Sequence, residues 1–177
     1  VMFVRTAVAA VCVLLLLVES TWLSGWNALF WDQDLYLASP WLLVFALYIS
    51  LFWHRYLALA IGLVFGFLHD IVFYVSMIGL YTAAMGLSAY FAGWQFQRFS
   101  RTFFSVQATI LFGLLLMDGF IYLAYRLFNL LDGSVQWAVF HYILPNVLLN
   151  MCFSIAVYAP ARWLIDKAVN PHREEED

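Results

Sequence analysis

Apolar residues along this chain fall into six long runs, which short segments with charged or polar residues separate. The runs cover about residues 2–23, 35–53, 56–75, 79–96, 103–125 and 137–164. A helix needs about 20 apolar residues to cross the hydrocarbon core of a bilayer, whereas a strand of a membrane barrel shows about 10 residues of alternating polarity. Continuous runs of this length therefore predict an all-α bundle of six transmembrane helices and argue against a β-barrel.

The composition limits what else the chain can contain. Of its 177 residues, 66% are apolar and 11% are charged, while a soluble domain has about 25% charged residues. Six helices leave too few residues for a folded domain in water, so residues 1–177 are predicted to form a single integral membrane domain. The net charge of −3 shows no basic patch that would favour nucleic acid as a partner.

Basic residues predict how the helices are oriented, because short cytoplasmic loops are enriched in Lys and Arg. With six helices, Arg126 falls on one side of the membrane and the other seven basic residues fall on the opposite side: Arg5, Arg55, Arg98, Arg101, Arg162, Lys167 and Arg173. Both termini are therefore predicted to be cytoplasmic. The segment Ser20–Ser39 becomes an aromatic outer loop that lies along the membrane surface, either as an irregular segment or as a short amphipathic turn of helix.

Small residues gather in the third and fourth runs. They are Gly62, Gly66, Gly79, Ala83, Gly86 and Gly93. Small side chains let helix backbones approach closely inside a bilayer, where lipid tails do not drive apolar helices together. This stripe has two interpretations: packing of the two helices within the chain, or docking of a helix from another protein.

Polar residues within the runs suggest a cluster near the outer face. At 1.5 Å per residue, Asp70 and Asp118 both lie roughly 22–24 Å from the inner ends of their helices. Arg126, His141 and Asn146 fall near the same level. Charges at such depth are costly and usually face the bundle interior or a partner. The cluster either opens outward to bind a ligand or partner, or pairs Asp70 or Asp118 internally with Arg126 or a histidine.

Pro145 lies within the sixth run and frees a backbone carbonyl, which Asn146 or Asn150 could satisfy at a kink or leave for a substrate contact. Elsewhere the chain lacks a Gly-rich phosphate loop, a nucleophile elbow, Cys/His metal spacing and the paired histidines of a membrane metalloprotease. We therefore expect no enzymatic activity, no metal and no cofactor.

A more specific pattern runs from the second apolar run to the fourth and returns in the sixth. It consists of Pro40, His54-Arg55, Gly62-x-x-x-Gly66-x-x-x-Asp70, Gly79-Leu80, and the later Pro145 and Asn150. This pattern resembles the rod shape-determining protein MreD family. In that family a Pro opens the second helix, a basic residue ends it, and a Gly-Leu turn follows the Gly-x-x-x-Gly-x-x-x-Asp stretch.

The resemblance implies a multi-pass protein of the bacterial inner membrane that belongs to the cell-elongation machinery and has no known catalytic activity. Its implied partners are MreC and, directly or through MreC, the MreB filament, RodA and penicillin-binding protein 2. The family is also similar in architecture to the substrate-binding subunits of energy-coupling-factor vitamin transporters.

Two hypotheses follow from this resemblance. The chain is either a scaffold that holds MreC and supports peptidoglycan synthesis and cell shape, or a transporter subunit that binds a small molecule in the outer polar cluster. The short cytoplasmic loops, which lack an obvious coupling motif, disfavour transport.

Overall fold

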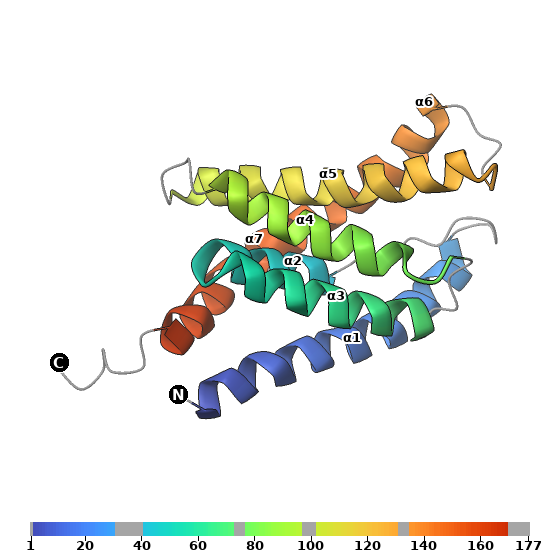
Figure 1. Ribbon diagram of the computed structural model, residues 1–177. Coiled ribbons are helices and arrows are strands. Elements are labelled where there is room, and N and C mark those ends of the chain that lie inside the picture. Colours follow the sequence, from blue (N-terminus) through green and yellow to red (C-terminus); the bar gives the residue numbers. More distant parts are fainter. Residues whose placement is uncertain (1, 31–40, 73–76, 97–101, 131–134, 170–177) are drawn as a thin grey trace, which may run out of the picture.

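The computed structural model describes residues 2–30, 41–72, 77–96, 102–130 and 135–169, and within these ranges every regular element is a helix (Figure 1). The elements are α1 (Met2–Phe30), α2 (Trp41–Phe52), α3 (Arg55–Val72), α4 (Leu80–Phe96), α5 (Phe103–Leu127), α6 (Val135–Ala138), the π-helix η1 (Val139–Ile143) and α7 (Leu144–Val169). The predicted all-α class is confirmed for the described part of the chain.

Three of the described helical segments are long and apolar enough to cross a membrane: Arg55–Val72, Phe103–Leu127 and Val135–Lys167. Two shorter apolar segments, Val8–Thr21 and Trp41–Phe52, accompany them. The last long segment joins α6, η1 and α7 into one nearly continuous rod, as the sixth apolar run predicts.

The first helix is longer than the sequence suggests. We expected an outer loop over Ser20–Ser39, but α1 continues to Phe30, so the first half of that segment is helical and its remainder lies outside the described residues. The hydroxyl groups of Ser20 and Thr21 each donate to the Leu17 carbonyl at 2.9 Å. Because these polar side chains bond back to their own helix, they do not end it.

Helix α2 forms the centre of the bundle. Every residue from Leu42 to Leu51 is buried, and α2 contacts α1, α3, α4, α5 and α7. A helix that is apolar on all sides is expected to be buried, and one of only 12 residues is shorter than a bilayer is thick. The predicted second span begins earlier, at about residue 35, but residues 35–40 lie outside the described part.

The remaining helices surround α2. In the view of Figure 1, α1, α3, α4 and α5 follow one another from bottom to top, with α2 and α7 behind them. The start of α1, the turn between α2 and α3, the last turn of α4 and the end of α7 all lie at the left end of the bundle in this view.

A π-helical turn interrupts the long helical segment formed by α6, η1 and α7. The Leu144 N–H bonds to the Val139 carbonyl, five residues back, which defines the π-helix η1. Pro145 has no N–H to give to the His141 carbonyl, and such an interruption favours a π-turn. An asparagine side chain was expected to donate to the backbone carbonyl that Pro145 leaves without a partner. The Asn150 amide instead donates to the Asn146 backbone carbonyl at 2.9 Å.

Candidate functional site

The stripe of small residues brings α3 and α4 into backbone contact. A Cβ atom placed on Gly62 would lie 2.9 Å from the Gly86 Cα, and one on Gly66 would lie 2.8 Å from the Thr82 Cα. Both distances are too short for a side chain. These two glycines of α3 therefore face α4 of the same chain.

The other small residues of the stripe lie on or beside α4. A Cβ on Gly86 would meet the Leu63 side chain, and one on Gly93 would overlap Ser50 Oγ. Ala83 is half-buried. Gly79 precedes α4 with φ +95°, in the left-handed region that favours glycine. Its role is to shape the turn rather than to make close helix packing, since a Cβ atom added there would have no neighbour within 4 Å.

Asp70, buried at the end of α3, caps the start of α4. Its carboxylate accepts hydrogen bonds from the backbone N–H groups of Gly79, Tyr81 and Thr82 at 2.9, 3.2 and 3.1 Å. The Thr82 hydroxyl donates a further bond at 2.7 Å. A carboxylate at this position satisfies N–H groups that have no partner within the helix and complements the helix dipole. Asp70 thus fixes the turn between α3 and α4.

Asp118 on α5 is bonded to Asn146 on α7. The Asn146 amide donates to both carboxylate oxygens, at 2.9 and 3.0 Å, and Asn150 donates to the Asn146 side-chain oxygen at 3.0 Å. Asp118 is 2% exposed, and Asn146 and Asn150 are fully buried. These three residues form a buried, hydrogen-bonded contact between α5 and α7.

Arg126 and His141 are placed apart from these contacts. Arg126 is exposed and donates to the Tyr122 hydroxyl at 2.9 Å, while exposed His141 stacks on Trp137, with ring centroids 5.2 Å apart. The five residues of the expected outer cluster are therefore not one site. Within the described part of the chain, Asp70 and Asp118 pair neither with Arg126 nor with a histidine; backbone N–H groups and an amide donate to them instead.

Three tyrosines lie near the two buried aspartates. The side chains of Tyr81 and Tyr142 are hydrogen-bonded to each other, and both lie within electrostatic range of Asp118. Tyr125 lies within range of Asp70. Asp70 and Asp118 therefore both lie near this group of tyrosines, although their direct hydrogen-bond partners differ.

Glu19 and His69 form a buried pair that the sequence analysis missed. Glu19 Oε1 lies 3.3 Å from His69 Nε2, and the two side chains are 1% and 2% exposed. The His69 ring also stacks on Tyr81, with centroids 4.6 Å apart. A signal for this pair is present in the sequence, since Glu19 is a lone carboxylate within the first apolar run, at a depth similar to that of His69.

A second missed contact joins α2, α5 and α7. The Tyr48 hydroxyl donates to the Ser154 carbonyl at 2.9 Å, and the Ser154 hydroxyl donates to Gln107 Oε1 at 2.9 Å. All three residues are buried. Each is a common polar residue within an apolar run, so only the packed structure shows that they meet.

Taken together, these buried polar groups connect helices to one another. Within the described residues, no group of three or more His, Cys, Asp and Glu side chains could hold a metal ion. The arrangement is suited to fixing helix positions, because the side chains of Asp70, Asp118 and Gln107 each bond to a residue of another helix or turn.

The family model for rod shape-determining protein MreD matches residues 4–168, which include nearly all of the described helices. The chain belongs to the MreD family. Membership confirms the resemblance and places the chain among membrane proteins that determine cell shape, which are not a known enzyme family. Searches of curated proteins and of solved structures each returned no match.

Proposed function

We propose that this chain is a non-enzymatic scaffold of the bacterial cell-elongation complex, which binds MreC and thereby supports peptidoglycan synthesis. The observation that carries the proposal is the MreD family match over residues 4–168. The buried side chains support it, because Asp70, Asp118 and Glu19 bond to neighbouring elements within the chain. Contact with MreB, RodA and penicillin-binding protein 2 would then pass through MreC.

The proposed setting is the inner membrane, which the single domain crosses six times with both termini in the cytoplasm. The start of α1 and the end of α7 lie at the same end of the bundle, which supports an even number of crossings (Figure 1). Arg55, Arg162 and Lys167 belong to elements that begin or finish at this end, whereas Arg126 is in the last turn of α5, at the other. Such an architecture would be similar to that of energy-coupling-factor substrate-binding subunits.

Within this proposal, the small-residue stripe serves packing inside the chain and MreC meets other faces. Gly62 and Gly66 contact α4, whereas the opposite side of α3 exposes Val64, Phe67 and Ile71. A transporter subunit that binds a small molecule is less well supported. Asp118 and Asn146, at the heart of the expected ligand site, are buried and bonded to each other.

Replacement of the native MreD-family protein in a rod-shaped bacterium tests the proposed function. Depletion is expected to round the cells, and expression of this chain is expected to restore their length-to-width ratio and the lateral pattern of peptidoglycan labelling. Rods that persist throughout verified depletion would contradict the proposal. Retention of a vitamin-sized molecule by the purified chain, detected by mass spectrometry, would instead favour the transporter alternative.

A further inference from the structure

Basic and aromatic side chains gather where α2 turns into α3. The Arg55 guanidinium carbon lies 5.1 Å from the Tyr56 ring centroid and 5.6 Å from that of Tyr90 on α4. The Tyr56 side chain forms hydrogen bonds with both Arg55 and Tyr90, and the His54 ring centroid lies 5.3 Å from that of Tyr56. We call His54, Arg55, Tyr56 and Tyr90 the Arg55 cluster.

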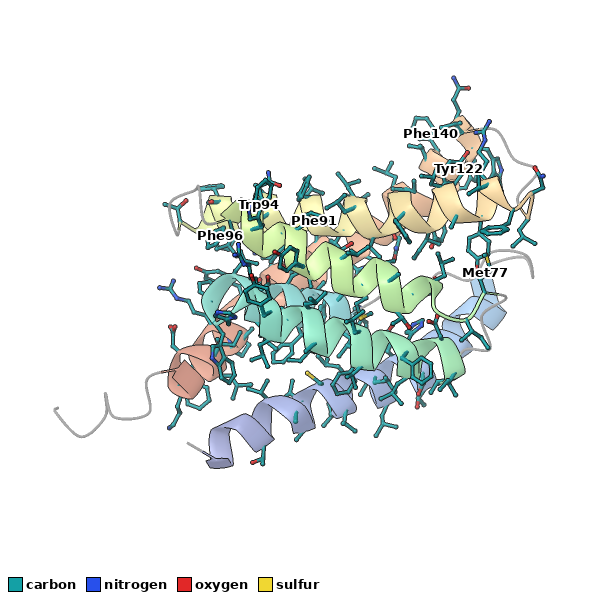
Figure 2. All side chains as sticks on the ribbon, viewed as in Figure 1. Met77, Phe91, Trp94, Phe96, Tyr122 and Phe140 are labelled. Carbon is teal, nitrogen blue, oxygen red and sulfur yellow. The ribbon has the colours of Figure 1, made fainter. Side chains whose placement is uncertain are left out.

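The Arg55 cluster lies at the edge between the apolar side of the bundle and one of its ends. Tyr56 is 52% exposed, and Trp94, one turn beyond Tyr90 on α4, is 46% exposed. Figure 2 shows Trp94 and Phe91 near this end of α4, where α4 approaches its last turn. Tyr and Trp favour the membrane–water interface, because their rings are apolar and their N–H or O–H groups are wet. The composition and exposure of the cluster are therefore typical of residues at the level of lipid headgroups.

Among the residues that the structure describes, positive charge exceeds negative charge at this end of the bundle. Arg55, Arg162 and Lys167 belong to it, while Asp166 is the acidic residue that the described part of the chain places here. Asp166 Oδ2 lies 3.6 Å from Arg162 Nε. Asp166 therefore forms an ion pair with Arg162, one turn earlier on α7.

We propose that the Arg55 cluster binds the phosphate of an anionic phospholipid headgroup. A guanidinium presents several N–H donors in a planar fork that matches the oxygens of a phosphate, and the two tyrosine rings hold that plane in place. The exposed His54 ring and Tyr56 hydroxyl add polar atoms beside it. The neighbouring exposed Trp94 and Phe91 supply an apolar surface for the acyl chains, which a free phosphate would not need.

Native mass spectrometry of the full chain tests this proposal. The protein would be released from nanodiscs that contain equal amounts of phosphatidylglycerol and phosphatidylcholine, and the retained lipids would be counted. The unmodified chain is expected to retain phosphatidylglycerol preferentially. Arg55→Gln is expected to lower this preference about five-fold, as for the loss of one cation near an anionic surface. Arg55→Lys, which keeps the charge but loses the planar fork, is expected to lower it by a smaller factor.

Arg162→Gln provides the matched control, since it removes one positive charge from the same end of the bundle but from a residue with an acidic partner. Its lipid preference is expected to stay close to that of the unmodified chain. Equal losses in Arg55→Gln and Arg162→Gln would overturn the proposal in favour of diffuse charge attraction. Binding of inorganic phosphate that displaces the phosphatidylglycerol would overturn the choice of a lipid. If Arg55→Gln does not fold, Arg55→Lys decides: an unchanged lipid preference in that variant would contradict the site.

Discussion

Asp118 and Asn146 illustrate how single polar residues act in this bundle. Two hydrogen bonds join the carboxylate on α5 to the amide on α7, and both side chains are buried. Hydrogen bonds between membrane helices are worth about 0.6–2 kcal/mol, whereas a buried group that loses its partner costs about 1–3 kcal/mol. Removal of one side chain is therefore expected to lower stability chiefly by leaving the other buried without a hydrogen-bond partner.

We predict that Asp118→Ala lowers the free energy of unfolding in detergent by about 1–3 kcal/mol, because it leaves the Asn146 amide buried without its carboxylate. A double-mutant cycle with Asn146→Ala should give a coupling energy of about 0.6–2 kcal/mol. Asp166→Asn is the control, since that carboxylate is 54% exposed and its loss should change stability by less than about 0.5 kcal/mol. A coupling energy of zero would show that the two side chains do not support each other.

At the scale of single residues, the sequence predicts how deep a polar side chain lies in the bundle but not which neighbouring helix it faces. Counting residues along the helices placed Asp118 and Asn146 at a common level, and the structure joins them. The same counting placed Arg126 and His141 near that level, but both contact residues four positions earlier on their own helices. The side of a helix that faces its neighbour depends on how all the helices pack, and a single apolar run contains little information about that.

At the scale of elements, the contact between α3 and α4 depends on glycine. The Gly-x-x-x-Gly spacing predicted a face for close packing, and the structure shows that α4 occupies this face. The Asp70 cap closes the same pair of helices at the adjoining turn. Backbone contact and cap together define a helical hairpin, which the sequence indicates through the spacing of Gly62, Gly66 and Asp70.

We predict that Gly62→Ala destabilises the chain by about 1–3 kcal/mol, because the new methyl group would press on the α4 backbone at Gly86. Gly119→Ala is the matched control on α5, where nothing lies within 4 Å of the added Cβ. Alanine favours a helix more than glycine does, so this control should be neutral or more stable by up to about 1 kcal/mol. Thermal unfolding in the same detergent measures both variants, and equal destabilisation would argue against tight packing of α3 on α4.

Helix ends were harder to predict than helix existence. The first apolar run was predicted to end near Leu23, yet α1 continues to Phe30, and the Ser20 and Thr21 hydroxyl groups bond back to their own helix. The contact between Glu19 and His69 was not predicted either. The Glu19 carboxylate lies inside the bundle, where it joins α1 to α3.

At the scale of the whole molecule, buried polar contacts tie the helices around α2. Glu19 and His69 join α1 to α3, Asp118 and Asn146 join α5 to α7, and Tyr48, Ser154 and Gln107 join α2 to both α5 and α7. A membrane bundle gains little from burying apolar surface against lipid, so such contacts and close backbone packing fix its shape. A bundle of fixed shape suits a scaffold that must present one surface to a partner.

Capture of MreC is the decisive test of the proposed scaffold function. The tagged chain and MreC would be produced together, extracted in mild detergent and purified through the tag, with an unrelated membrane protein of similar size carrying the same tag as the control. We predict that MreC elutes with the chain in a constant ratio through size-exclusion chromatography and is absent from the control. A monodisperse, folded chain that elutes without MreC would contradict the scaffold function.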